Sequence, residues 1–321
     1  MKTNLWNLIL CAGCSFAAGL TASAVPLARP DLPADPAWLL HIDFDGLRPT
    51  TIGQFIQSQL DKPEAQAKLA VFQAVFSIDL RKQLHGVTLY GASPVPEEGV
   101  LLVYADFDPN RLVTLARAAN EYQSSSHNQH TIHSWLDENK KDKSGNHPRV
   151  YAAIQGPRVI FGQREAPVAA ALDVLDGTAP NLASSKNFPQ LGAPGKACFI
   201  LGGARKLDFP DSDPNAAILR LSRQIRLEIG EADSRLAATL TLDANDDQIA
   251  QHVASIAQGL VALMKLQRSK PEATKLADAI ALKQDGVSVV ATLNLPASDV
   301  VDILKAGAAR KAEKAEKAQK E

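Results

Sequence analysis

The densest group of side chains with chemical potential is a set of three histidines, His127, His130 and His133. Imidazole nitrogens bind zinc and copper well, so a metal site is one hypothesis for this segment. The spacing argues against it, because on a strand His130 and His133 point to opposite faces, and a helical pair of ligands would be four residues apart. We therefore interpret them as solvated loop histidines and keep the metal site as the alternative.

A second candidate group is His41, Asp43 and Asp45, which occupy alternate positions of an expected strand. Alternate residues share one face, so the three side chains could converge on a cation or work as an acid and base pair. The residues between them are apolar: Leu40, Ile42 and Phe44. This alternation is also typical of a half-buried antiparallel strand with a polar face in solvent, which is the interpretation we prefer.

Other signatures of catalysis or cofactor binding are missing from the sequence. The segment 192–196 (GAPGK) lacks the spacing and the Ser or Thr of a phosphate-binding loop. There is no G-x-S-x-G elbow, no H-E-x-x-H, no dinucleotide fingerprint and no calcium loop. Cys198 lies in an apolar run and is expected in the core. We therefore predict no catalytic residue and no cofactor.

The N-terminus has the three parts of a secretory signal peptide. Lys2 supplies the positive charge, the segment 5–20 is uncharged and mostly apolar, and 22–24 (ASA) has the small residues that signal peptidase requires. We predict that residues 1–24 are removed and that the exported chain begins at Val25.

Two other fates of this N-terminus remain as alternatives. The Gly-Cys pair that ends at Cys14 would allow a lipid anchor after cleavage at that site. An uncleaved membrane anchor is disfavoured because the apolar run is shorter than the roughly 20 residues of a membrane-spanning helix. We expect a periplasmic or secreted protein with no transmembrane segment after signal cleavage.

Composition excludes some classes of function. The chain has 34 basic and 35 acidic residues, and this balance argues against a nucleic-acid partner, which requires a basic surface. Cys11 and Cys14 lie in the predicted signal, so Cys198 would be alone in the mature chain and no internal disulfide would form. With 45% hydrophobic residues, the fold must be held by an apolar core.

The periodicity of apolar residues predicts alternating strands and helices after a Pro-rich lead at 25–36. In the first part of the chain we expect strands at 38–44, 86–91, 99–107, 131–135, 150–154 and 158–161, and helices at 51–60, 63–76, 109–119 and 166–175. Segments 124–128 and 137–148 are expected as polar loops, and 178–195 as a linker.

The same order of elements starts again after the linker. We expect strands at 196–201, 225–229, 235–242, 279–282 and 287–293, and helices that begin at Asp213, Asp246 and Pro296. The tail at 308–321 is rich in Lys, Glu and Ala and is typical of a solvated helix.

This recurrence predicts an internal duplication. The predicted class is α+β, with two duplicated units at 37–177 and 196–307, each an antiparallel sheet with helices packed on one face. Aligning Pro167 with Pro296 also places Asp173 on Asp302, in what we expect to be equivalent helices. The alternative is that two mixed units of Ala-rich helices and hairpins are alike without common descent.

The first unit combines strand pairs, a helix that opens at Asp108-Pro109, and a small-residue helix followed by Asp176-Gly177. This arrangement resembles a module of uncharacterised exported bacterial proteins over residues 37–177. The resemblance implies export, and because that family has no assigned activity it implies no functional residue.

Two hypotheses of function follow. The first is a non-catalytic protein of the cell envelope that binds an unknown partner or ligand through its sheets or between its units. The second is a metal-dependent hydrolase that uses His41, Asp43 and Asp45. Stoichiometric metal in the purified protein would separate them, since only the hydrolase requires it.

Overall fold

The structure is a computed structural model of the chain. It describes residues 26–138, 140–141, 145–189, 191–192, 197–205, 222–267 and 271–318, with side chains up to 310. The predicted signal peptide 1–24, with Cys14, therefore lies outside the described residues, as do most of the 192–196 segment and the helix expected at Asp213.

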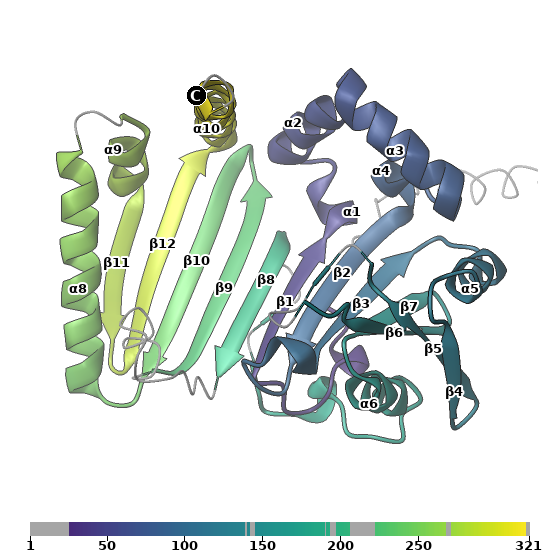
Figure 1. Cartoon of the computed structure of the whole chain (residues 1–321). Coiled ribbons are helices and arrows are strands. Elements are labelled where there is room, and N and C mark those ends of the chain that lie inside the picture. The colour runs from purple at the N-terminus through teal and green to yellow at the C-terminus, as the bar shows by residue number, and fades with distance from the viewer. Residues whose placement is uncertain are drawn as a thin grey trace, which may run out of the picture.

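One antiparallel sheet of twelve strands organises the described chain (Figure 1). Its order is β11-β12-β10-β9-β8-β1-β2-β3-β7-β6-β5-β4. The first seven strands are β1 Trp38–Asp43, β2 Leu84–Gly91, β3 Gly99–Ala105, β4 Gln123–His127, β5 His130–Leu136, β6 Arg149–Gln155 and β7 Arg158–Gly162. The remaining strands are β8 Cys198–Arg205, β9 Ser222–Ala232, β10 Arg235–Ala244, β11 Ile280–Asp285 and β12 Ser288–Pro296.

Helices connect the strands and pack on the sheet. Those before β4 are α1 Phe44–Leu47, α2 Thr51–Leu60, α3 Pro63–Phe76, α4 Leu80–Gln83 and α5 Pro109–Arg117. Those after it are α6 Glu165–Leu175, α8 Asp247–Leu266, α9 Pro271–Asp278 and α10 Ala297–Ala318. Three short 3₁₀ turns are η1 Arg29–Asp31, η2 Pro96–Glu98 and η3 Leu182–Ser184.

The strand order occurs twice. The first run is β1-β2-β3-β7-β6 and the second is β8-β9-β10-β12-β11, while the hairpin β4–β5 extends the first run beyond β6. The two runs meet where β1 pairs with β8, from Trp38 opposite Ala204 to Ile42 opposite Ile200. The α+β class is confirmed, and the runs share the expected strand order, but they form one continuous sheet instead of two.

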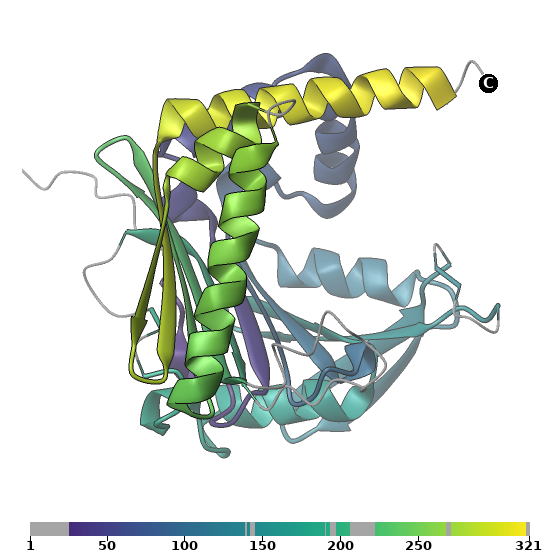
Figure 2. The same cartoon turned by 90° about the vertical axis from the view of Figure 1, so that its left-hand side faces the viewer.

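The helices occupy both faces of the sheet. We call the face that carries Leu40, Leu89 and Leu240 the inner face, and the opposite one the outer face; the register places these three residues in one row. Figure 2 shows α5, α8 and α10 on the inner side of the curled sheet and α6 on the other side. The expected arrangement, with helices on one face of the sheet, is therefore found in the second run only. The equivalent helices α6 and α10, which we expected in matching places, lie on opposite faces.

The outer face of the first run is covered by the lead and the linker, which we had expected to be mere connections. Both enter the main core, which includes Leu27, Leu32, Leu182, Phe188 and Leu191. The Arg29 guanidinium fastens them together by donating to the backbone carbonyls of Leu182, Asn187, Phe188 and Leu191 at 2.8–3.3 Å. The sequence analysis did not predict this packing, although large apolar residues stand among the Pro and Ser residues of both segments.

The sequence analysis missed one strand and some short helices. The expected loop 124–128 is β4, a polar edge strand that pairs with β5 alone. An edge strand with one neighbour buries little, so its Ser-rich sequence carries no apolar alternation. The short helices α1, α4 and α9 were also not expected.

Helix α8 is the one helix of the described chain that is long and apolar enough to span a membrane by length and composition, with a mean hydropathy of 1.3. It packs on the inner face through Ala250, Val253 and Ala254. Only 17% of its apolar window is buried, and Leu260 and Leu263 remain exposed.

Candidate functional site

The structure reverses the expected orientation of the central strand β1. His41 and Asp43 are 1% and 3% exposed, whereas Leu40 on the inner face is 37% exposed. The polar side is buried because the lead and the linker cover the outer face. The His41 Nδ1 atom lies 2.8 Å from the Thr88 hydroxyl oxygen on the neighbouring strand.

Asp45 does not continue this face, because the strand ends at Asp43, whose carboxylate caps α1 at the Gly46 N–H, 2.8 Å away. The Asp45 carboxylate instead pairs with Arg48 and with His85 Nδ1, 2.9 Å away. The proposed trio is therefore divided between separate networks. Among the described residues, no group of three His, Cys, Asp or Glu side chains could hold a metal ion.

The three clustered histidines are part of the β4–β5 hairpin and are not loop residues. His127 and His130 face each other across the hairpin and reach carboxylates of α6: His127 Nε2 lies 2.8 Å from Asp173, and His130 Nε2 lies 2.8 Å from Asp176. His133 points to the opposite face, as its odd spacing predicts. The first two histidines thus fasten the hairpin to α6.

A cavity of about 310 Å³ lies on the inner face, between α3, α5 and strands β5–β7. Sequence reasoning did not find it. Its lining is almost entirely apolar and consists of Val75, Phe76, Leu112, Val113, Leu115, Ala116, Ala119, His133, Trp135, Ala152, Ala153, Ile154, Val159 and Phe161. The amphipathic pattern of α5 was the one sequence feature that pointed to this site, since its apolar face contains Leu112, Leu115 and Ala116. Such a local pattern cannot show that a cavity remains between the packed elements.

The roof of the cavity is made by α5 and the end of α3. Arg111 of α5 donates to the carbonyl oxygens of Val75 and Ala74 at 2.9 and 3.1 Å, which holds the end of α3 over the cavity. Phe76 stacks on Phe72 with ring centroids 4.4 Å apart. No α3 residue is fully buried, so these contacts carry much of its attachment.

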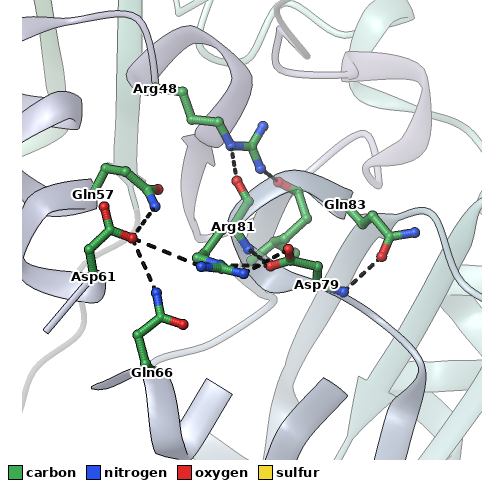
Figure 3. A network of polar contacts seen from close by, with 8 residues as sticks. Arg48, Gln57, Asp61, Gln66, Asp79, Arg81 and Gln83 are labelled. Carbon is green, nitrogen blue, oxygen red and sulfur yellow. Dashed lines mark hydrogen bonds and ion pairs between the residues drawn. The ribbon is translucent and has the colours of Figure 1, made fainter. Parts of the chain in front are cut away.

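A polar network anchors the other end of the α2–α3 pair (Figure 3). Asp61 accepts from Gln57 and Gln66 at 3.2 Å, and Arg81 binds Asp79 through two bonds of 3.0 Å. These bonds from Arg81 lower the pKa of Asp79. The Asp61 side chain therefore links α2 and α3.

His133 is the polar member of the cavity lining. It is 7% exposed, and its Nδ1 atom lies 2.9 Å from the Tyr122 hydroxyl oxygen. Burial lowers the pKa of His133, and the nearby charge of Arg117 lowers it further. The neutral imidazole is therefore favoured, and its Nε2 atom has no hydrogen-bond partner within the described part of the chain.

The floor of the cavity continues across the sheet as an apolar row. The register places His133, Ala152, Phe161, Leu101, Leu89 and Leu40 side by side on successive strands. Leu89 and Leu40 stay exposed although they are large and apolar. The row therefore leads from the cavity out onto the uncovered middle of the inner face.

A second cavity, of about 540 Å³, lies on the outer side between the lead, α6 and the segment 179–180. Its carboxylates already have partners: Asp35 pairs with Arg205, Glu98 with Arg164, and Asp173 with His127. We interpret these ion pairs as structural contacts that hold the covering segments in place.

Comparisons with known proteins yield similarity of fold. No protein-family model and no curated protein matches the sequence. Among solved structures, crystal form III of TP0453, a Treponema protein, aligns over 88% of this chain and 98% of its own, with 10% identity and a TM-score of 0.49. Crystal form IV aligns over 88% and 97%, with 12% identity and a TM-score of 0.44.

Proposed function

We propose that this chain is a non-catalytic protein of the cell envelope that binds an elongated apolar ligand on the inner face of its sheet. The cavity beneath α5 carries the proposal. An apolar cavity of about 150 Å³ binds benzene, which has six heavy atoms. By proportion, a cavity of about 310 Å³ has room for a ligand, or part of one, with about a dozen heavy atoms. The exposed row toward Leu89 and Leu40 offers a longer ligand further apolar contact.

The alternative of a metal-dependent hydrolase has less support. It needs His41, Asp43 and Asp45 on one accessible surface, and two of these side chains are buried on the outer face. The cavity, in contrast, is almost entirely apolar, and the imidazole of His133 in its lining pairs with the Tyr122 hydroxyl group. We therefore favour binding over hydrolysis.

Filling the cavity tests the binding proposal. Ala116 lines the cavity, so Ala116→Phe should reduce the affinity for decan-1-ol at least tenfold, as measured by titration calorimetry. Ala118→Phe places the same side chain at the exposed end of α5 and should bind like the wild type. Equal affinity of all three proteins, or no binding by any of them, would exclude the cavity as the site.

Location in the envelope is a separate part of the proposal. It is supported by the predicted signal peptide. Expression in a bacterial host followed by cell fractionation and N-terminal sequencing should give an exported chain that starts at Val25. A retained Met1 or a lipid-modified Cys14 would contradict it.

A further inference from the structure

The cavity under α5 contains a polar atom that no described residue binds. His133 lines the cavity and is only 7% exposed, and its Nδ1 atom is bonded to the Tyr122 hydroxyl group. The Nε2 atom of the same ring forms no hydrogen bond with a described residue, and the described residues do not seal it from the space around it. A buried polar atom without a partner costs free energy, so this atom is suited to bind a ligand in the cavity.

The imidazole of His133 is held in place by its neighbours. The Tyr122 hydroxyl oxygen lies 2.9 Å from Nδ1, and the two rings stack with centroids 6.0 Å apart. If Tyr122 donates to Nδ1, the ring proton is on Nε2, which then donates to a ligand oxygen; in the other tautomer Nε2 accepts from a ligand. A hydroxyl group both donates and accepts, so it satisfies Nε2 in either case.

The lining disfavours a charged head group. The other lining side chain with a polar atom is Trp135, whose indole N–H also forms no hydrogen bond with a described residue. No Asp, Glu, Lys or Arg side chain of the described chain lines the cavity, and Arg117 at the end of α5 is exposed outside it. Burying a carboxylate or an ammonium group without a counter-charge costs far more than burying a hydrogen-bonded hydroxyl group.

We infer that the ligand is an aliphatic alcohol, whose hydroxyl group binds Nε2 of His133 and whose chain follows the apolar row toward Leu89 and Leu40. This inference rests on the proposed function and names its ligand class. The register places Ala152 and Phe161 next to His133 in that row. The chain of the alcohol therefore meets apolar side chains directly beside the polar contact.

Three probes separate the polar contact from the cavity as a whole. Decan-1-ol has the hydroxyl group, decanoate has a carboxylate on a chain of the same length, and butylbenzene has no polar group. Wild-type protein should bind decan-1-ol at least tenfold more tightly than decanoate in calorimetric titrations at pH 8, because the carboxylate loses its hydration without gaining a counter-charge. Decanoate that binds as tightly as decan-1-ol would overturn the inference.

His133→Leu is the diagnostic variant. It replaces the imidazole by an apolar side chain of similar size, so the affinity for decan-1-ol should fall about tenfold, while butylbenzene should bind at least as tightly as before. Retained binding of butylbenzene also shows that the variant is folded with its cavity intact. His252→Leu, which removes an exposed histidine from α8, should change neither affinity. Equal binding of decan-1-ol to wild type and His133→Leu would contradict the inference.

The nitrogen-15 NMR signal of His133 Nε2 in the wild type gives a readout that needs no variant. A new hydrogen bond at this atom shifts its resonance, so decan-1-ol should move the signal much further than butylbenzene does. If decan-1-ol binds without moving this signal, its hydroxyl group lies elsewhere and the inference fails, although the cavity still binds. If neither probe binds to the wild type, the proposed function itself fails.

Discussion

At the scale of residues, Asp31 shows how a charge is accommodated in an apolar layer. Its carboxylate accepts from Arg158 Nε at 2.7 Å, from Arg158 Nη2 at 3.0 Å and from the Tyr104 hydroxyl at 3.1 Å. Burial, and then the charge of Asp31, raise the pKa of Tyr104 well above its usual range, so Tyr104 stays protonated and remains a donor. The three bonds tie the lead to β3 and β7.

We expect Asp31→Asn to lower the free energy of unfolding by about 3 kcal/mol, because it leaves the half-buried Arg158 without its counter-charge. Urea denaturation would measure the change. Asp35→Asn removes a carboxylate that pairs with Arg205 at the surface, so it should cost less than about 1 kcal/mol. Similar losses in the two variants would show that the Asp31 pair is not a buried one.

His133 should make the folded state sensitive to acid. Its pKa is lowered on folding, so the unfolded chain takes up a proton at a higher pH than the folded protein does. The stability that the neutral ring provides is present above the ordinary pKa of about 6.5 and is lost as the pH falls through the lower folded value.

The comparison that isolates this effect is wild type against His133→Asn, with urea midpoints measured from pH 7.5 to pH 5. The variant should lose less stability on acidification. Both proteins keep His127 and His130 with their partners near α6, so the contributions of these two residues cancel in the difference. Parallel pH profiles would contradict the prediction.

The sequence predicted the alternation of β1 but not which side is buried. A period of two places His41 and Asp43 together, and hydrophobicity assigns that face to solvent. The assignment failed because the lead and the linker cover the face of His41 and Asp43, whereas Leu40 on the other face stays exposed. Likewise, the odd spacing of His130 and His133 was informative, while the partners of each imidazole come from distant parts of the chain.

At the scale of elements, the lead and the linker cover the outer face of the first run, where a helical layer would otherwise be needed to bury the sheet. Phe188 is fully buried in the core cluster beneath the sheet, and it packs against the position of Gly203, where a Cβ atom would lie 2.8 Å from its ring. The linker is therefore a structural element, although it contains little regular secondary structure.

Phe188→Ala should lower the free energy of unfolding by about 3–5 kcal/mol, the usual cost of removing a buried aromatic ring. Val71→Ala, on the exposed side of α3, should change it by less than about 0.5 kcal/mol. Chemical denaturation followed by circular dichroism would measure both. A small effect of Phe188→Ala would mean that the linker can leave the sheet without loss.

Elements with local signals were predicted well. The bounds of α2 and α3 agree with the sequence, because Thr50 caps the first and Pro63 opens the second. Asp108 and Asp246 cap α5 and α8 as expected. The edge strand β4 and the covering role of the linker depend on what packs against them, so local composition could not reveal either.

At the scale of the whole molecule, the two runs share one sheet but not one core. The main cluster lies under the first run and includes Leu201 from β8, whereas the clusters under α8 and α10 are small. The second run therefore depends on its junction with the first for part of its stability.

We expect a single cooperative unfolding transition for the described fold. Trp38 lies in the first run and Trp135 in the β4–β5 hairpin that extends it, so their fluorescence reports this part of the sheet, while far-ultraviolet circular dichroism reports both runs. The two signals should change at the same urea concentration. A dichroism transition that continues after the fluorescence change is complete would show that the runs unfold independently.

The junction also dictates an order of events during synthesis. Strand β1 is made early, but one of its two neighbours, β8, emerges from the ribosome only after the whole first run has been made. Until then β1 presents an unpaired edge, and the linker that covers the outer face is also absent. Pairing so distant in sequence is slow to form, so the nascent chain stays incompletely folded for most of its synthesis. An incompletely folded chain can pass through a narrow channel, which suits the export that we propose.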